Sequence, residues 1–380
     1  MELFSNQPLR KRPHIAVLGS NKLGNFVVTT PLLRGLKAKY PNCTLDFFGS
    51  DLTREFEENL ATIDWRFSLH SHSPDGVAPL KAAIQRRQHC YGAYDLAINC
   101  DEYSDLTHRA MSVIQPTYVV GGATSSAFDE TLDFGKHPVQ CMLQDANWNG
   151  PTFVQKYRDV TQSNYIAELL CRLAYVETDF TQLELPIQSP RFAVPDVLVH
   201  VTASRAAKLW LPEYWQRVIA WCQQQGVTVG LVGSRSDVQK QLYHADDVED
   251  QLLLNTTLID LRGQATLPEL AGALAQTKAF ITVDTGPLHI AAAVSCPTVA
   301  IFGNDRDGDG VSPVRLWAPR QPWVKLALSD AKCTLCQEQR FKNQTCLQEQ
   351  QQCMVELPPE RVIRLLQDCL QMRALSGVEV

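Results

Sequence analysis

The chain has 380 residues, more than a single hydrophobic core usually supports, so its length predicts two domains. Hydrophobic residues make up 45% and charged residues 20%, which is ordinary for a globular protein. The net charge of -6 argues against general nucleic-acid binding, because that function requires a basic surface. We interpret the basic run RKR at 10–12 as a solvated edge, which would at most touch an anionic inner-membrane surface or substrate.

Neither a membrane span nor a secretory signal is predicted. The longest uncharged stretch, 286–303, is interrupted by Pro287 and Pro297 and ends like a strand. The N-terminus lacks an apolar core followed by a cleavage site of small residues. We therefore expect a cytoplasmic protein whose twelve cysteines are reduced thiols or metal ligands rather than disulfides.

Short apolar runs bounded by Gly, Asp or Asn predict strands that are buried on both faces. In the first half these runs are HIAVLG (14–19), LDFFGS (45–50), YDLAIN (94–99) and TYVVGG (117–122). In the second half they are VLVHVT (197–202), VTVGLVG (227–233), LIDLRG (258–263), AFITVD (279–284) and TVAIFG (298–303). Helix-like stretches lie between them at 29–40, 212–226 and 267–277. The alternation predicts an α/β fold with doubly wound parallel sheets.

The two series of strands are separated by ELPIQSPRFAVP (184–195), which contains three prolines and is the predicted linker. We predict an N-terminal domain over 1–185 and a C-terminal domain over 186–357. An amphipathic helix within 358–380 is expected to pack back on the N-terminal domain. The stretch 125–157 shows no clean period and is interpreted as an irregular insertion or an acceptor-side loop.

A candidate anion site lies where the strand at 279–283 meets the following helix. Ligands of open parallel sheets collect at the carboxyl ends of strands, where Asp284 stands. Thr285 is a natural N-cap, and the N–H groups and dipole of the helix attract anions. Gly286 would let a phosphate approach the backbone, and His289 lies near the same mouth. Walker A and GxGxxG motifs are absent here, so these residues alone leave a well-capped helix as an equal alternative.

The stretch VDTGPLHIAAAVSCPTVAIFG (283–303) resembles the signature of family 9 glycosyltransferases, the heptosyltransferase group. Further stretches similar to this family lie at 258–286, 200–234 and 24–41. The resemblance implies a GT-B fold, in which two Rossmann-like domains face a cleft, with the acceptor on the N-terminal domain and the nucleotide sugar on the C-terminal one. It implies inverting transfer of a sugar, usually heptose from ADP-heptose, to a glycan, lipid or protein hydroxyl in surface glycan synthesis, with no cofactor needed for catalysis.

The same resemblance implies roles for individual residues. Lys208 would contact the donor phosphates, although an ordinary surface lysine is the alternative. Asp284 would bind sugar hydroxyls or cap backbone N–H groups, and His289 would orient the phosphates unless it is only a buried core histidine. The remaining residues on the donor side are Gly233, Ser234, Asp237, Leu261, Arg262, Gly263, Thr285 and Gly286.

One position departs from the family pattern. The family motif is Gly-Asp, with the aspartate as presumed general base, but this chain has Gly24 and Asn25. An amide has no useful proton affinity near neutral pH. Three alternatives follow: Asp101 or Glu102, after the strand at 94–99, is the base; the acceptor needs little base; or the protein binds a donor without transferring sugar. An epimerase or a phosphorylase on the same fold is a weaker alternative.

Three further residues follow the first strand, on the expected acceptor side. Lys22 would meet an anionic acceptor, or it is simply a solvated lysine. The hydroxyls of Thr29 and Thr30 would cap the helix, which is the favoured interpretation, or contact the acceptor.

Four cysteines near the C-terminus follow the pattern CxxC-x9-C-x6-C within the insertion 333–353. In a reducing compartment this pattern predicts a structural metal site with four thiolate ligands, Cys333, Cys336, Cys346 and Cys353. Zinc is the default ion for such a site and iron is the alternative suggested by the family resemblance. Free thiols or a redox pair remain the other interpretation. Four other cysteines lie in apolar contexts and are expected in the core: Cys171, Cys222, Cys296 and Cys369.

Overall fold

The computed structural model describes residues 1–70, 77–101, 104–122, 137–235, 248–304 and 312–375. The chain divides into two compact units. Unit 1 comprises residues 1–148 and 152–186, and unit 2 comprises residues 149–151 and 187–380. Each unit is built around a parallel sheet of six strands, which confirms the predicted α/β class. The main division, after Pro186, lies within the proline-rich stretch predicted as the linker.

The sheet of unit 1 has the strand order β1-β6-β5-β2-β3-β4, with all neighbouring strands parallel. Its strands are β1 (Glu2–Leu3), β2 (His14–Leu18), β3 (Thr44–Ser50), β4 (Trp65–His70), β5 (Leu96–Asn99) and β6 (Tyr118–Val120). Its helices are α1 (Leu23–Lys39), α2 (Arg54–Asn59), α3 (Val77–Tyr91), α4 (Asp105–Ile114), α5 (Pro138–Gln144), α6 (Phe153–Lys156) and α7 (Ile166–Leu173). Every strand predicted in this half is present, whereas β1 and β4 were not predicted.

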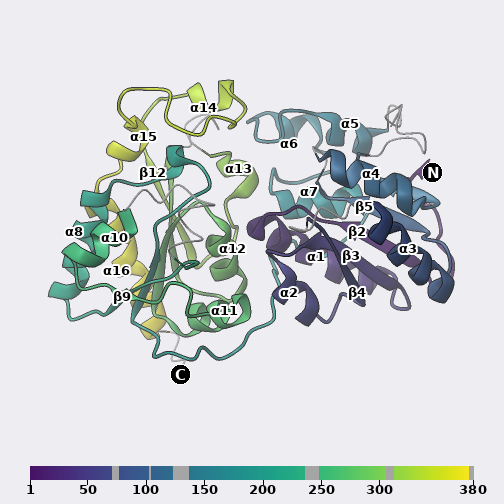
Figure 1. The fold of residues 1–380 in the computed structure, drawn as a ribbon. Coiled ribbons are helices and arrows are strands. Elements are labelled where there is room, and N and C mark those ends of the chain that lie inside the picture. Colours follow the sequence, from purple (N-terminus) through teal and green to yellow (C-terminus); the bar gives the residue numbers. More distant parts are fainter. Residues whose placement is uncertain (71–76, 102–103, 123–136, 236–247, 305–311, 376–380) are drawn as a thin grey trace. The chain divides into compact units, whose positions relative to one another are not determined.

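The sheet of unit 2 has the order β12-β11-β10-β7-β8-β9 and is also parallel throughout. Its strands are β7 (Val197–His200), β8 (Val229–Leu231), β9 (Ile259–Asp260), β10 (Ala279–Val283), β11 (Thr298–Asn304) and β12 (Val324–Ser329). Its helical segments are η1 (Ala206–Lys208), α8 (Pro212–Gln224), α10 (Val248–Asn255), α11 (Leu267–Gln276), α12 (Gly286–Ala293), α13 (Val314–Trp317), α14 (Leu335–Glu338), α15 (Gln352–Val355) and α16 (Pro359–Leu375). Helices α8, α10 and α16 lie on one side of this sheet, and α11 and α12 lie on the other (Figure 1).

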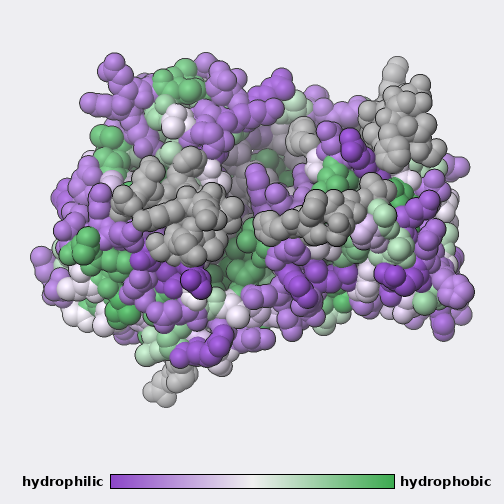
Figure 2. All heavy atoms as spheres, in the orientation of Figure 1, coloured by the Kyte–Doolittle hydropathy of each residue, from purple (hydrophilic) through white to green (hydrophobic). Residues whose placement is uncertain are grey.

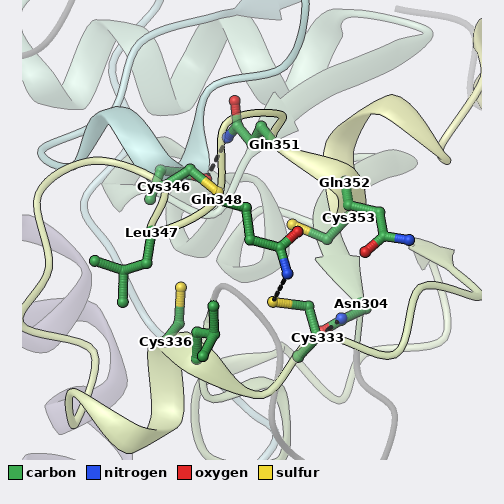
Figure 3. A pocket seen from close by; sticks show the side chains of 11 residues that line it. Asn304, Cys333, Cys336, Cys346, Leu347, Gln348, Gln351, Gln352 and Cys353 are labelled. Carbon is green, nitrogen blue, oxygen red and sulfur yellow. Dashed lines mark hydrogen bonds between the residues drawn. The ribbon is translucent and has the colours of Figure 1, made fainter.

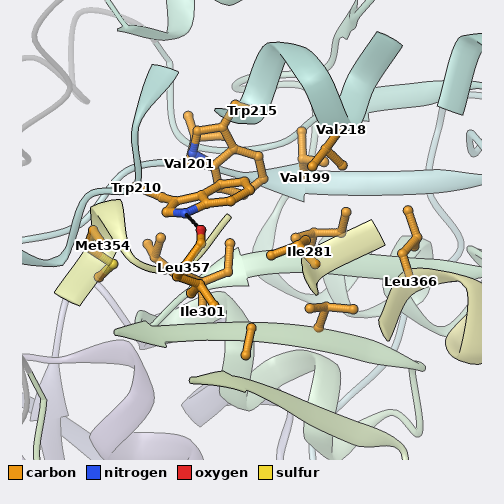
Figure 4. Close-up of a cluster of buried hydrophobic side chains, with 14 of the residues drawn as sticks. Val199, Val201, Trp210, Trp215, Val218, Ile281, Ile301, Met354, Leu357 and Leu366 are labelled. Atoms are coloured by element: carbon orange, nitrogen blue, oxygen red, sulfur yellow. Dashed lines mark hydrogen bonds between the residues drawn. The ribbon is translucent and has the colours of Figure 1, made fainter. Parts of the chain in front are cut away.

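The core of unit 2 is formed by apolar residues of its strands and of α8 and α16 (Figure 4). Two tryptophans, Trp210 and Trp215, meet edge to face with ring centroids 5.1 Å apart. The indole Nε1 of Trp210 donates to the carbonyl of Leu357 at 3.0 Å, so its polar atom is satisfied inside the core. The four cysteines expected in the core, Cys171, Cys222, Cys296 and Cys369, are all buried, which confirms that prediction.

Helix α16 packs within unit 2, against α8 and against β10, β11 and β12. Its residues Val362, Leu366 and Cys369 are fully buried in the core of that unit. The apolar stripe of this helix therefore packs on the sheet of its own unit, which the helix pattern alone did not specify. The predicted packing on the N-terminal domain stays a prediction.

Hydrophilic residues cover much of the visible surface of both units (Figure 2). Among the helices of the described ranges, none combines the length and the apolar character that crossing a membrane would require. One residue of the basic run at 10–12, Arg10, forms hydrogen bonds within unit 1. The guanidinium of Arg10 donates to Asp95 at 2.7 Å and to the carbonyls of Tyr91 and Ala93.

Candidate functional site

An ion pair stands at the carboxyl end of the unit 2 sheet. Lys208 ends the short turn η1 that follows β7, and Asp284 follows the neighbouring strand β10 directly. The Nζ atom of Lys208 lies 2.6 Å from Oδ2 of Asp284 and 3.4 Å from its backbone carbonyl. Asp284 is buried, which opposes ionisation, but the charge and the hydrogen bond of Lys208 lower the pKa of its carboxyl group. The carboxylate is thus ionised and held by a cation.

The N-terminus of α12 opens beside this ion pair. Thr285 occupies the N-cap position, as predicted, but its side chain makes no capping hydrogen bond. Its Oγ1 atom instead lies 3.3 Å from Nδ1 of His200, which ends β7, and 3.4 Å from the hydroxyl of Thr282. Thr285 and Gly286 are half-buried. The side chain of Thr285 thus caps none of the first amides of α12. Because Pro287 has no N–H and the N–H of Leu288 donates to the carbonyl of Thr285 at 3.2 Å, the N–H of Gly286 is the first-turn amide that could meet an anion.

Two buried histidines flank this helix start. Burial lowers the pKa of His200 to about 4 and that of His289 to about 4, so both imidazoles are neutral near pH 7. Among the described residues, the buried Nδ1 atom of His289 has no hydrogen-bond partner, and its ring meets Trp317 edge to face with centroids 6.4 Å apart. Since unpartnered buried polar atoms are costly, this nitrogen is a candidate for a ligand hydrogen bond.

The next strands of the sheet carry the remaining predicted donor residues. The N–H of Gly263 donates to the carbonyl of Gly233 at 2.9 Å, so these two predicted residues do lie together. Ser234 is exposed beside them, while Asp237 lies outside the described residues. The guanidinium of Arg262 instead binds three carboxylates, those of Glu249, Asp250 and Asp260. The prediction that Arg262 approaches the base or phosphate region is not supported, because its charge is already neutralised.

Leu261 precedes this arginine at the end of β9. Its side chain is buried and lies against the backbone of Gly230, a residue of β8. It therefore packs the sheet rather than facing a ligand.

A second candidate region lies at the carboxyl end of the unit 1 sheet. Strands β2 and β5 are parallel neighbours, with Leu18 opposite Asn99 and the N–H of Cys100 donating to the carbonyl of Leu18 at 2.9 Å. The segment leading to Asn25, in the first turn of α1, and the segment leading to Asp101 therefore leave the sheet side by side. The predicted general-base candidate Asp101 thus follows the strand that neighbours the one leading to Asn25. Glu102 lies outside the described residues.

The backbone of Asp101 is held firmly. Its N–H donates to Oδ1 of Asn99 at 3.0 Å, and its carbonyl accepts from the hydroxyl of Thr107 at 2.9 Å and from the N–H of Ser104 at 3.2 Å. Burial raises the pKa of its half-buried carboxyl group, while His70, Lys22 and His108 act in the opposite direction. A carboxyl group with a raised pKa and a fixed backbone is suited to accept a proton.

His70 ends β4 and His108 lies in the first turns of α4. Their Nε2 atoms are buried, and neither has a hydrogen-bond partner in the part of the chain that the structure describes. A Cβ atom at Gly122 would come within 2.3 Å of Nε2 of His108, so glycine is required there. Sequence reasoning missed both histidines. His70 ends a strand that was not predicted, and His108 lies in a helix that was not predicted.

The hydroxyls of Thr29 and Thr30 lie inside unit 1. The side chain of Thr29 donates to the carbonyl of Asn25 at 2.8 Å, and that of Thr30 donates to the carbonyl of Val27 at 2.8 Å. Both residues are buried, and the hydroxyl of Thr30 also accepts from the N–H of Glu184. Each hydroxyl proton is therefore already used in a bond within α1 and is not available to an acceptor substrate. Lys22, by contrast, is exposed just before α1.

The four cysteines of the insertion line one pocket (Figure 3). Cys336 and Cys353 are buried, and Cys333 and Cys346 are partly exposed. Burial, together with the neighbouring thiols of the other three cysteines, raises the pKa of Cys353 to about 12. Amide N–H groups of Asn343 and Gln348 point at sulfur, at 3.2 Å from Cys336 and 3.5 Å from Cys333. The four thiols thus share one pocket.

The sulfur geometry is nevertheless not that of an assembled metal site. Within the described ranges, no three or more His, Cys, Asp or Glu side chains are grouped so that they could hold a metal ion. All four thiols are free rather than disulfide-bonded. The predicted metal site therefore stays a prediction, supported by donor type and by the shared pocket.

Comparison with known proteins places the chain among glycosyltransferases. The model of glycosyltransferase family 9 (heptosyltransferase) matches residues 142–345. The chain is 32% identical over 294 residues to lipopolysaccharide heptosyltransferase 3 of Escherichia coli K12, covering 74% of this chain and 79% of that protein. It is 26% identical over 172 residues to lipooligosaccharide heptosyltransferase 2 of Campylobacter jejuni, covering 44% of this chain. That match spans about half the relative's length, 48%.

Solved structures share the fold. A family 9 glycosyltransferase of Veillonella parvula superposes with a TM-score of 0.66 at 17% identity, covering 95% of this chain and 97% of that one. The ADP-heptose lipopolysaccharide heptosyltransferase II of E. coli gives a TM-score of 0.63 at 15% identity, with 95% and 99% covered. TibC, an iron-containing dodecameric glycosyltransferase of enterotoxigenic E. coli, gives 0.56 at 16% identity, with 98% and 82% covered. At these identities the likeness concerns the fold alone.

Proposed function

The chain belongs to glycosyltransferase family 9, and we propose that it transfers a sugar from a nucleotide-diphosphate donor to a hydroxyl acceptor during surface glycan synthesis. The observation that carries this proposal is the Lys208–Asp284 pair beside the start of α12. The donor we propose is ADP-heptose, because structural relatives are described as ADP-heptose enzymes and were crystallised with ADP or an ADP-heptose analogue.

Lys208 is suited to hold the donor diphosphate. An ammonium group has three donor hydrogens. In the described residues it contacts two acceptors, both on Asp284, so a third hydrogen is available to a phosphate oxygen. The amides at the start of α12 add a second positive pole. Together they would stabilise the nucleotide diphosphate as it leaves, so we propose that transfer needs no additional cofactor.

The chemistry we propose is inversion at the anomeric carbon. The acceptor oxygen forms the new bond to that carbon while the bond to the diphosphate breaks, and the electron pair of the broken bond leaves with the diphosphate. The acceptor proton passes to a base. Asn25 cannot take it, so we assign the proton to the carboxylate of Asp101, which leaves the sheet beside the Asn25 segment. Lys22 would then attract an anionic acceptor at the same sheet edge.

The amide at Asn25 also favours a second candidate function, that of a donor-binding protein without transferase activity. Both functions require the same donor site. They differ in product formation: a transferase converts ADP-heptose and a truncated lipopolysaccharide acceptor to ADP and an extended glycan, whereas a binding protein leaves the donor unchanged.

Calorimetric titration with ADP and ADP-heptose tests the donor site. The Lys208→Ala variant is expected to weaken ADP binding by roughly 100-fold, because a charge-assisted contact to phosphate is lost. Lys278→Ala is the matched control. Lys278 is a lysine of unit 2 that pairs with Asp196 at 2.7 Å, beside the start of β10 rather than its end. Equal ADP affinity in the wild type and the Lys208 variant would refute the assigned donor site.

We further propose that Cys333, Cys336, Cys346 and Cys353 hold one structural zinc or iron ion. The donor set of four thiols fits such an ion, and the amide N–H groups directed at two sulfurs would stabilise thiolate ligands. The ion would tie segments of the insertion together, and no catalytic role is assigned to it.

Metal analysis of the purified protein tests this site, with about one ion per chain expected. Metal chelation, or a Cys336→Ser change, should then lower the unfolding temperature, because metal binding of this kind is coupled to folding. Cys222→Ser is the control, since Cys222 is a buried cysteine outside the pocket. A metal-free protein with an unchanged unfolding temperature after chelation would refute the proposal.

A further inference from the structure

The side chain of Gln351 forms hydrogen bonds with the backbone on both sides of Lys208. Its Nε2 atom donates to the carbonyl of Ala207 at 2.5 Å and to the carbonyl of Leu209 at 3.0 Å. Both acceptors belong to the Lys208 turn, which we define as residues 205–209. Gln351 itself belongs to the cysteine segment, defined as residues 331–353, and lines the cysteine pocket (Figure 3). One amide group thus holds the residues before and after Lys208, the proposed phosphate-binding residue, although it lies 142–144 residues away in the sequence.

Arg205 makes a second connection between the same two segments. Its Nε and Nη2 atoms donate to the backbone carbonyl and to Oδ1 of Asn343, at 2.7 and 2.9 Å. The Nδ2 atom of Asn343 in turn lies 3.2 Å from the sulfur of Cys336. Arg205 is only 8% exposed, so these bonds form largely away from water, where geometry matters most. A continuous chain of contacts therefore runs from a pocket cysteine to the Lys208 turn.

The Lys208 turn has little internal support of its own. Segment η1 has three residues, and in its turn bonds the N–H of Lys208 donates to the carbonyl of Arg205 and the N–H of Leu209 to the carbonyl of Ala206. Such short 3₁₀ turns have weak hydrogen-bond geometry. A third contact comes again from the cysteine segment, where the carbonyl of Gln344 accepts the N–H of Ala207 at 2.9 Å. The direction in which Lys208 leaves the backbone is thus set mainly from outside the turn.

We propose that Gln351, Arg205 and Asn343 are positioning residues that fix Lys208 for the donor diphosphate. The cysteine segment then acts on donor affinity through the Lys208 turn, although it contributes no group to the donor itself. A long lysine side chain can reach many positions, so holding its backbone reduces the conformational entropy lost when it binds phosphate. This inference rests on the proposed donor role of Lys208.

The test compares two adjacent glutamines by calorimetric titration with ADP. Gln351→Glu keeps the size of the side chain but replaces the donating amide by a carboxylate, which would face two carbonyls. Gln351→Ala removes the group altogether. Both are expected to weaken ADP binding by about tenfold or more. Gln352→Ala is the control, because Gln352 lines the same pocket but bonds the exposed Glu356 at 2.7 Å. It should leave ADP affinity unchanged.

A double-mutant cycle separates positioning from general destabilisation. In a Lys208→Ala background, Gln351→Ala should cause no further loss of ADP affinity, because its effect acts through the missing lysine. Additive losses would overturn the inference while leaving the donor site intact. If Lys208→Ala alone left ADP binding unchanged, the proposed function itself would fail.

Arg205→Lys and Asn343→Ala provide independent variants if the Gln351 variants do not fold. Each removes part of the second connection, and each should weaken ADP binding several-fold with a circular dichroism spectrum like that of the wild type. Unchanged ADP affinity in folded variants of both Gln351 and Arg205 would overturn the inference.

Discussion

The carboxyl ends of the two sheets differ in how their charged groups are satisfied. In unit 2, Lys208 and Asp284 form a direct ion pair, and His200 lies within hydrogen-bond distance of Thr285. In unit 1, the Asp101 carboxylate interacts electrostatically with His70, Lys22 and His108, and within the described residues no hydrogen bond joins it to these groups.

This difference separates two tasks. A paired, buried network keeps its geometry when a ligand arrives, which suits recognition of a fixed diphosphate. A carboxylate that is desolvated and balanced by nearby cations has a proton affinity that small changes can shift, which suits proton transfer. Unit 2 therefore has the features of a binding site, and unit 1 those of a site for chemistry.

The largest expected effect comes from Asp101→Asn in unit 1. If this carboxylate takes the acceptor proton, its loss should lower kcat for heptosyl transfer by roughly 10²–10⁴-fold. The ADP affinity measured by calorimetry should not change, because the proposed donor residues lie in unit 2. A loss of ADP binding would contradict the division of tasks described above.

The companion variant is Asn25→Asp, which restores the family motif beside Asp101. In the Asp101→Asn background it should recover part of the lost transfer rate. Asp105→Asn is a control, because Asp105 lies at the exposed start of α4. If the Asp101 variant turned over like the wild type, Asp101 would not be the general base; another group would take the proton, or no base would be needed.

The next effect concerns the stability of unit 2 in acid. The pKa of His200 and that of His289 are both lowered by burial from 6.5 to about 4. Between pH 6.5 and pH 4, each histidine is protonated in the unfolded chain but neutral in the folded chain. The free energy of unfolding therefore falls as the pH drops from 6.5 to 4. The full loss is roughly 3 kcal/mol per histidine.

Urea denaturation at several pH values between 4.5 and 8 measures this loss. His289→Gln cannot titrate, so its unfolding free energy should depend less steeply on pH than that of the wild type. Asp284 contributes in a lower range, since its pKa is lowered and its stabilisation disappears only as the pH falls through that lowered value. If the unfolding free energies of variant and wild type changed in parallel with pH, His289 would be protonated in the folded chain as readily as in the unfolded chain.

Sequence patterns predicted nine of the twelve strands in the two described sheets, all but β1, β4 and β12, and also the joint between β10 and α12. Most of the predicted runs are buried and are bounded by Gly, Asp or Asn, whereas β9 is exposed. They did not predict the Lys208–Asp284 bond, since its partners are 76 residues apart and meet only because β7 and β10 are neighbours. Likewise, Arg262 looked available in the sequence, and only the fold reveals its three carboxylate partners.

The smaller misses have a common cause. Residues of β4 are all of intermediate burial, so this edge strand lacks the continuous apolar character that marked the others, and His70 was missed with it. Helix α16 was predicted, but its docking surface was not. Burial of one helix face is a property of the partner surface, which a local pattern does not identify.

A moderate effect is expected from Thr285→Val in unit 2. The change keeps the shape of the side chain but removes the hydroxyl that lies 3.3 Å from Nδ1 of His200. ADP binding should weaken about five- to tenfold, as for the loss of one hydrogen bond near the phosphate site. Thr285→Ser, which retains the hydroxyl, should bind ADP like the wild type. Equal affinities for the Val and Ser variants would show that the hydroxyl is not part of the paired network.

The smallest effect is expected from Thr29→Val, which probes where the unit 1 site ends. The Thr29 hydroxyl is buried and donates to the carbonyl of Asn25, so its loss should lower the free energy of unfolding by about 1 kcal/mol. The KM for the acceptor should stay the same, because the hydroxyl proton already has an acceptor within α1. A tenfold rise in acceptor KM with unchanged stability would mean that Thr29 reaches the acceptor. The chemical site of unit 1 would then extend from Asp101 into the first turns of α1.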